Sequence, residues 1–277
     1  MLRARVLFTA IAVPLGIIVI FVGNWLFALV VSLILARGVW EYAIVFERGG
    51  NRPARSLMVI SIFILVAARF SLSFSADSWL LTLFVLLAMT VHLVSYERGR
   101  TKAATDFTTT LSGFFYIGLL GSYFISLRSL PHGEWWLLFS LFAVWLTDSG
   151  AFFLGTAYGR HKMTPRLSPH KSWEGYVGGV LVGTLVTPLF LFVFLRLGLP
   201  NDPAFSFLNV AILSFAIGTL TTLGDLGESM LKRQMKVKDA SHLIPGHGGV
   251  LDRIDSWLWA LPIGYYVVSL VFLQIPN

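Results

Sequence analysis

The stretch that most constrains the architecture is residues 205–224, which read FSFLNVAILSFAIGTLTTLG and contain no charged side chain. About 20 helical residues are needed to cross a hydrocarbon core of about 30 Å, so this run has the length of one transmembrane helix. Further runs of the same character lie near 6–23, 25–46, 57–74, 79–96, 107–127, 135–157, 173–196 and 251–273. The sequence therefore predicts an all-α polytopic membrane protein with about nine transmembrane helices.

The composition excludes an ordinary soluble protein. Charged residues make up 13% of the chain, against about 25% in a typical soluble domain. Hydrophobic residues make up 56%, and the mean hydropathy is +0.76. Nine spans leave about 100 residues for loops and ends. We therefore expect a single membrane domain over 1–277, with an N-terminal helical part (1–135) and catalytic helices with cytoplasmic loops (136–277). The absence of cysteine excludes disulfides, thiolate nucleophiles and cysteine-ligated zinc.

The distribution of positive charge predicts the orientation. If the N-terminus is cytoplasmic and the loops alternate, 17 of the 21 lysines and arginines lie on the cytoplasmic side, as the positive-inside rule requires. With nine spans, the C-terminus then lies on the opposite side. The run near 6–23 is longer than a secretory h-region and no small-residue cleavage site follows it, so we expect a retained helix.

One carboxylate, Asp148, lies within the apolar run near 135–157. A charged side chain inside a membrane helix costs from about 2.5 kcal/mol upward unless it faces a polar cavity or an ion. Asp148 is therefore a candidate metal- or substrate-binding residue. The alternative is a packing role, in which the carboxylate is bonded to Ser or Thr hydroxyls.

A second polar stretch, residues 166–175, reads RLSPHKSWEG. Ser168-Pro169 indicates a turn just before a helix, because proline removes a backbone donor and fixes φ. The N-terminus of that helix offers free N–H groups to anions, so Lys171 and Ser172 beside it are suited to bind phosphate oxygens. The alternative is a positively charged loop that Trp173 anchors at the interface.

The richest stretch contains two pairs of acids with helical spacing. Asp225 and Glu228 close the eighth span, and Asp252 and Asp255 open the ninth. Acids gathered at one depth repel each other unless a cation lies between them, and their hard oxygen ligands suit Mg²⁺. The sequence therefore predicts a divalent-cation site at the cytoplasmic surface.

Basic residues and glycines surround these acids. Lys232 and Arg233 follow the first pair, and the glycines of His247-Gly248-Gly249 let the backbone approach a ligand closely. Carboxylates for a divalent ion and cations for a polyphosphate, at the membrane surface, indicate phosphoryl or nucleotidyl transfer between a nucleotide and a lipid phosphate. No Gly-Lys dipeptide occurs, which excludes a Walker A loop. The alternative is a solvated, salt-bridged loop with ordinary helix caps.

Three motifs carry a resemblance to a known family. The longest, from Ser229 to Asp255, reads S-x-L-K-R-x4-K-D-x-S-x2-I-P-x-H-G-G-V-x-D-R-I-D. The second, at 168–175, has His170 where Lys or Asn is more familiar, and a third, weaker one covers 148–152. Together they resemble the signatures of the phosphatidate cytidylyltransferases (CDP-diacylglycerol synthases), whose membrane fold also agrees with nine spans.

This resemblance implies the reaction of CTP with phosphatidic acid to give CDP-diacylglycerol and pyrophosphate, in phospholipid biosynthesis. It also implies Mg²⁺ with a second, monovalent cation such as K⁺, a homodimer, and a bacterial-type inner membrane with the active site facing the cytoplasm; no nucleic acid is expected as a partner. The implied metal ligands are Asp225 and Asp252, then Asp148 and Asp255. The implied catalytic residues are Asp225, Asp252, Lys232 and Arg233. The implied substrate-binding residues are Lys171, Ser172, Asp148, Ser229, Lys238, His247, Gly248, Gly249 and Arg253.

Two other classes of protein stay open. One is a CTP-dependent lipid kinase, or a cytidylyltransferase for another lipid phosphate. The other is an ion-coupled transporter, which would need the ionisable residues Arg37, Glu41, Arg69 and His92 in the first half. Against the transporter, the acids gather at one surface rather than near the midplane, where transporter sites lie. We expect those four residues to partner one another or to snorkel.

Overall fold

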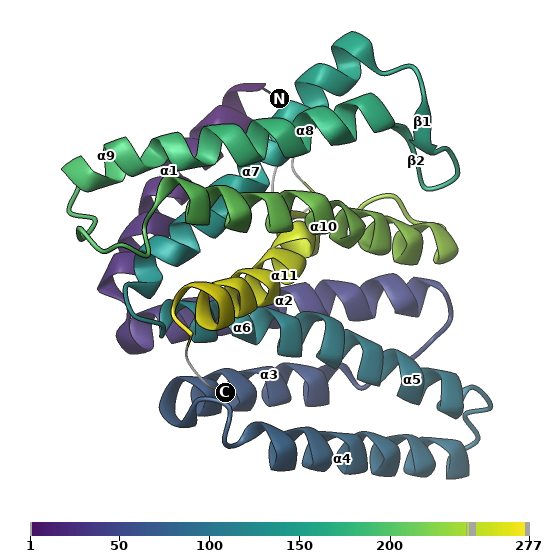
Figure 1. Ribbon diagram of the computed structural model, residues 1–277. Coiled ribbons are helices and arrows are strands. Elements are labelled where there is room, and N and C mark those ends of the chain that lie inside the picture. The colour runs from purple at the N-terminus through teal and green to yellow at the C-terminus, as the bar shows by residue number, and fades with distance from the viewer. Residues whose placement is uncertain (1, 242, 244–247, 275–277) are drawn as a thin grey trace. The chain divides into compact units, whose positions relative to one another are not determined.

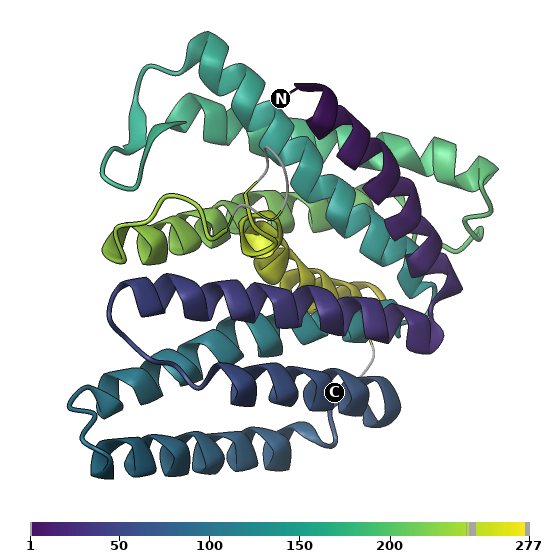
Figure 2. The same ribbon diagram turned by 180° about the vertical axis from the view of Figure 1, so that it is seen from behind.

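The computed structural model describes residues 2–241, 243 and 248–274, and within them the chain is helical apart from loops and one two-stranded hairpin (Figure 1, Figure 2). Eight helical stretches of this described chain are long and apolar enough to cross a membrane. The first predicted span corresponds to α1 (Leu2–Val22), in which Thr9–Val22 is a shorter apolar helix. The prediction of an all-α polytopic membrane protein is confirmed, and its orientation stays a prediction.

The chain divides into two compact units, each made of two segments. The first unit contains residues 1–126 and 231–254, and the second contains residues 127–230 and 255–277. Helices α10 (Phe207–Gln234) and α11 (Leu251–Tyr266) each have residues in both units. The single membrane domain expected over 1–277 stays a prediction.

The helices of the first unit that follow α1 lie side by side in both views (Figure 1, Figure 2). Its elements are α1, α2 (Asn24–Arg48), α3 (Arg55–Leu72), α4 (Asp77–Glu97), α5 (Ala103–Gly113), the π-helical turn η1 (Phe114–Leu119) and α6 (Leu120–Arg128) as far as Ser126. Apolar side chains fill the space between them, and those that are fully buried include Leu35, Val39, Met58, Ile62 and Ile117.

Buried ionisable residues of the first unit have partners within it. Arg69 donates to the Asp77 carboxylate and to Ser126 Oγ at 2.7 Å. His92 Nε2 lies 2.8 Å from Thr110 Oγ1. These contacts join neighbouring helices, so both ionisable residues take part in the packing of the first unit.

The second unit contains the longest predicted spans and the hairpin. Its elements are α7 (Gly133–Tyr158), β1 (Lys162–Thr164), β2 (Ser168–Ser172), α8 (Trp173–Val186), the 3₁₀ turn η2 (Thr187–Leu189), α9 (Phe190–Arg196), α10 as far as Met230, α11 from Asp255 and the π-helical turn η3 (Val267–Phe272). The antiparallel hairpin connects α7 to α8 (Figure 1).

Helices α7 and α8 pack closely because α8 has glycine at every fourth position facing α7. A Cβ at Gly175 would lie 2.8 Å from the carbonyl oxygen of Ala151, and one at Gly179 would lie 2.5 Å from that of Thr147. A Cβ at Gly183 would overlap the Thr147 side chain. Such small-residue stripes let membrane helices approach until their backbones are in contact. This packing fixes the position of the hairpin between the two helices.

Helix α10 continues to Gln234, six residues beyond Glu228, which was expected to close the eighth span, because backbone hydrogen bonds hold a helix together after its side chains become polar. One local expectation was wrong. Residues 168–172 form strand β2 rather than a turn. Pro169 is tolerated there because both strands of a two-stranded ribbon have an open edge, where a missing N–H costs no ladder bond.

Candidate active site

Three carboxylates converge in the second unit. Asp225 and Glu228 on α10 and Asp255 on α11 each offer one oxygen, and these oxygens all lie within 4.8 Å of one another. The two helices approach closely because a glycine precedes the first acid: a Cβ at Gly224 would lie 2.6 Å from the Asp255 carbonyl oxygen and from the Trp259 ring. The sequence predicted Asp225 and Asp255 as ligands and omitted Glu228.

The burial of this acidic cluster makes its charge expensive. Glu228 is 1% exposed and Asp255 is 8% exposed. Two unit charges about 5 Å apart repel by about 3 kcal/mol at an effective dielectric constant of about 20. A cation among the oxygens would relieve this repulsion, and a set of hard carboxylate oxygens is the donor type that Mg²⁺ prefers. The donor chemistry of the cluster therefore fits the expected metal.

Lys171 supplies positive charge to the same cluster. Its ammonium forms an ion pair with the Asp225 carboxylate. Strand β2 holds Lys171 in place, because β2 pairs with β1 through Ser172 and Lys162. Ser172 then caps α8, since its side-chain oxygen accepts a hydrogen bond from the Gly175 N–H at 3.2 Å. The two residues that the sequence predicted together thus differ in role: Lys171 contacts an acid of the cluster, and Ser172 caps α8.

A second predicted carboxylate, Asp252, lies in the first unit and organises the loop before α11. It accepts a hydrogen bond from Lys232 Nζ at 2.5 Å and from the backbone N–H groups of Ala240 and Gly249 at 3.1 and 2.7 Å. Gly248 has a φ of +80°, and a Cβ there would lie 2.6 Å from Asp252 Oδ2. The glycines of the long motif therefore make room for this carboxylate.

Glu41 on α2 holds the other side of the same loop, and the sequence assigned it only to the transporter alternative. Its side chain is fully buried. It accepts hydrogen bonds from Ser241 Oγ at 2.6 Å, from the Leu251 N–H at 2.8 Å and from Arg37 Nε at 3.1 Å. The carboxylate thus caps the N-terminus of α11, where free N–H groups favour negative charge. Glu41 is a structural anchor of the motif.

The other predicted site residues are distributed over both units. Asp148 lies exposed on α7, and Ser229 is half-buried on α10. Arg233, Lys238 and Arg253 lie exposed in the first unit. His247 lies outside the described residues. The metal and substrate roles of all these residues stay predictions.

Glu228 could have been included from the sequence, whereas Glu41 could not. Glu228 is spaced i,i+3 from Asp225, so a continued helix brings both to one face. Glu41 contacts residues 200 and 210 positions away, and no local pattern indicates such a pairing.

The chain is similar to known cytidylyltransferases over most of its length. The chain matches the cytidylyltransferase family over residues 3–271. It is 30% identical to a phosphatidate cytidylyltransferase of Synechocystis sp. over 305 aligned residues, which cover 99% of this chain and 98% of the relative. It is 34% identical to that of Bacillus subtilis over 191 residues, or 69% of this chain and 68% of the relative. The Haemophilus influenzae enzyme is 48% identical over 138 residues, which cover 49% of this chain and 46% of the relative.

Proposed function

The chain belongs to the cytidylyltransferase family, and we propose that it transfers a cytidylyl group from CTP to phosphatidate, giving CDP-diacylglycerol and pyrophosphate. The observation that carries this proposal is the cluster of half-buried Asp225 with buried Glu228 and Asp255, which has Lys171 beside it. An integral membrane protein with such a cluster can bind a lipid phosphate and a nucleoside triphosphate at one site. The similarity to phosphatidate cytidylyltransferases over nearly the full chain supports the same substrates.

Asp225, Glu228 and Asp255 would hold Mg²⁺, because their oxygens already lie close enough to share one ion. When bound, the ion supplies positive charge to the phosphate oxygens of the nucleotide. Lys171 would supply a further charge, and its contact with Asp225 keeps the ammonium at the cluster while no phosphate is bound. Lysine acts on phosphate as a mobile point charge with three donors.

The transfer itself needs one bond formed and one bond broken. An oxygen of the phosphatidate phosphate attacks the α-phosphorus of CTP in line, and the bond from that phosphorus to the bridging oxygen of the β-phosphate breaks. Pyrophosphate leaves with the bonding electron pair. A phosphate monoester has a second pKa of about 6, so the nucleophile is already an anion near neutral pH and no general base is required.

The remaining predicted residues complete the proposal. Lys232 and Arg233 are assigned to phosphate binding, and Asp252 and Asp148 are each assigned as metal ligands. The contacts of Asp252 with Lys232 and Gly249 support at least a role in ordering the motif. Ser229, Lys238, His247, Gly248, Gly249 and Arg253 are assigned to substrate binding.

The cellular setting is also part of the proposal. The excess of lysine and arginine in alternate loops supports a cytoplasmic N-terminus and an active site that faces the cytoplasm. A homodimer in a bacterial-type inner membrane is expected, and cross-linking in native membranes would detect the dimer.

One assay separates this function from its alternatives. Purified protein is incubated with Mg²⁺, phosphatidic acid and CTP that carries the label at the α- or the γ-phosphate. Cytidylyl transfer puts the α-label in the lipid and releases pyrophosphate, whereas a lipid kinase would transfer the γ-label. Replacing CTP in turn by each of the other nucleoside triphosphates tests which base the protein accepts. The absence of any labelled lipid would contradict both readings.

A further inference from the structure

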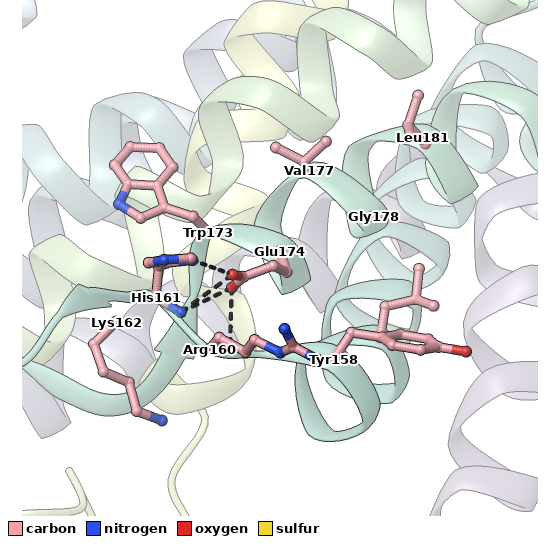
Figure 3. Close-up of a pocket in the computed structure, with 10 residues that line it drawn as sticks. Tyr158, Arg160, His161, Lys162, Trp173, Glu174, Val177, Gly178 and Leu181 are labelled. Carbon is pink, nitrogen blue, oxygen red and sulfur yellow. Dashed lines mark hydrogen bonds and ion pairs between the residues drawn. The ribbon is translucent and has the colours of Figure 1, made fainter.

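A groove lies between the C-terminal end of α7 and the first turns of α8 (Figure 3). Its volume is about 1050 Å³. Apolar side chains from both helices line its length, and basic residues from the connection between α7 and β1 line one end. The lining residues include Leu154, Tyr158, Val177, Leu181, Arg160 and Lys162. The groove is therefore amphipathic along its axis.

The basic end is held in place by Glu174, from the first turn of α8. Its carboxylate accepts hydrogen bonds from the backbone N–H groups of Arg160 and His161 at 3.1 and 3.2 Å, and it lies 2.5 Å from His161 Nδ1 (Figure 3). Within the part of the chain that the structure describes, the side-chain cations of Arg160 and Lys162 have no ion-pair partner. Two cations thus stand at the mouth of an apolar groove, and the nearby acid is engaged by the loop.

The dimensions of the groove fit one leaflet of a bilayer. Both lining helices belong to stretches long and apolar enough to cross a membrane, Gly133–Tyr158 and Trp173–Arg196. From Trp173 to Leu181 a helix rises about 12 Å at about 1.5 Å per residue. Half of a hydrocarbon core of about 30 Å is about 15 Å. An acyl chain in the groove would therefore run through most of one leaflet while its head group lies at the two cations.

The hairpin contains residues of both the groove and the acidic cluster. Lys162 on β1 pairs with Ser172 on β2, and the adjacent Lys171 contacts Asp225. A phosphate held at Lys162 is thus bound by the same two-stranded element that supplies a cation to the carboxylates.

We propose that the α7–α8 groove is the phosphatidate-binding site, with an acyl chain against Leu154, Val177 and Leu181 and the phosphate monoester against Arg160 and Lys162. This assignment rests on the proposed function. A small head group that carries up to two negative charges matches two unpartnered cations better than a singly charged or zwitterionic head group does. The two cations therefore favour phosphatidate over these other lipids by charge.

The test uses the full chain in phosphatidylcholine nanodiscs that contain a lipid with a diazirine on its acyl chain. The probe is phosphatidic acid in one arm, and phosphatidylglycerol or phosphatidylcholine in the others; cross-linked peptides are mapped by mass spectrometry. We expect the phosphatidic acid probe to label the peptides that contain Leu154, Val177 and Leu181 at least about threefold more than either other probe. Equal labelling by the three probes would overturn the proposal.

A kinetic arm tests the cations. Arg160→Gln and Lys162→Gln should each raise the KM for phosphatidic acid about fivefold, leave the KM for CTP unchanged and reduce the labelling by the phosphatidic acid probe. Arg166→Gln is the matched control, because it removes one exposed cation from the same hairpin outside the groove. An unchanged KM for phosphatidic acid in the Arg160→Gln/Lys162→Gln double variant would contradict the assignment. Failure of the proposed function appears differently, as a wild-type chain that transfers no cytidylyl group, and the labelling pattern still reports on the groove.

Discussion

The Glu41 carboxylate accepts a hydrogen bond from the backbone N–H of Leu251, 2.8 Å away and 210 residues later in the chain. The same carboxylate accepts a hydrogen bond from Ser241 Oγ. Ser241 and Leu251, which both belong to the long motif, are thereby hydrogen-bonded to α2. Helix α2, which contains no motif of its own, therefore contributes directly to the positions of Ser241 and Leu251 in the long motif.

Replacing Glu41 by alanine should destabilise the protein. The change leaves the Leu251 N–H and the Ser241 hydroxyl without their acceptor in a buried position, which costs about 1–3 kcal/mol. Thermal unfolding in detergent would measure the loss. The control is Glu47→Ala on the same helix, which removes a partly exposed pair with Arg55 worth at most about 1 kcal/mol. Equal unfolding temperatures for the two variants would contradict the anchoring role.

Replacing Gly249 by alanine should also destabilise the protein, because there is no space for the added methyl group. The new Cβ would overlap the Glu41 carboxylate and lie 2.9 Å from Ser241 Oγ. Forcing a methyl group into packed space costs about 1–3 kcal/mol. Gly16→Ala is the matched control, because nothing lies within 4 Å of a Cβ at that position. A Gly249→Ala variant that unfolds at the wild-type temperature would contradict this crowding.

Replacing Lys171 by alanine should weaken the use of CTP. A charged hydrogen bond contributes about 1.5–3 kcal/mol, so its loss raises the KM for CTP by about tenfold or more. Steady-state kinetics with varied CTP would show this rise. Lys102→Ala removes an exposed lysine of the first unit and should leave the KM unchanged. A Lys171→Ala enzyme with the wild-type KM would remove this residue from the phosphate site.

Replacing Glu228 by glutamine should reduce turnover at least about tenfold, because the amide keeps the shape of the side chain and removes one charged ligand. The matched control is Glu134→Gln, which changes an acid of the same unit that pairs with Arg128. Initial rates of pyrophosphate release at saturating substrates would compare the two variants. Full activity in Glu228→Gln would restrict the site to the aspartates.

The sequence predicts the helices well because each span depends on apolar side chains that are adjacent in the chain. Helix α10 extends past the apolar run 205–224 because charged residues such as Asp225, Glu228 and Lys232 do not end a helix. Lys171 and the acidic residues were identified because charge near apolar spans is costly and therefore conspicuous. The roles of two other residues were not predicted. Ser172 caps α8 rather than binding phosphate, and Glu41 bonds to Leu251, which lies 210 residues later in the chain.

The central claim is that Asp225, Glu228 and Asp255 together bind the magnesium that the transfer requires. The most direct test strips the purified enzyme with EDTA and measures pyrophosphate release from CTP and phosphatidic acid as Mg²⁺ is added back. The wild-type enzyme should recover full activity. Asp225→Asn, Glu228→Gln and Asp255→Asn should each recover none, or need at least about tenfold more Mg²⁺, because each removes a charged ligand. Recovery of all three variants at the wild-type Mg²⁺ concentration would contradict the claim.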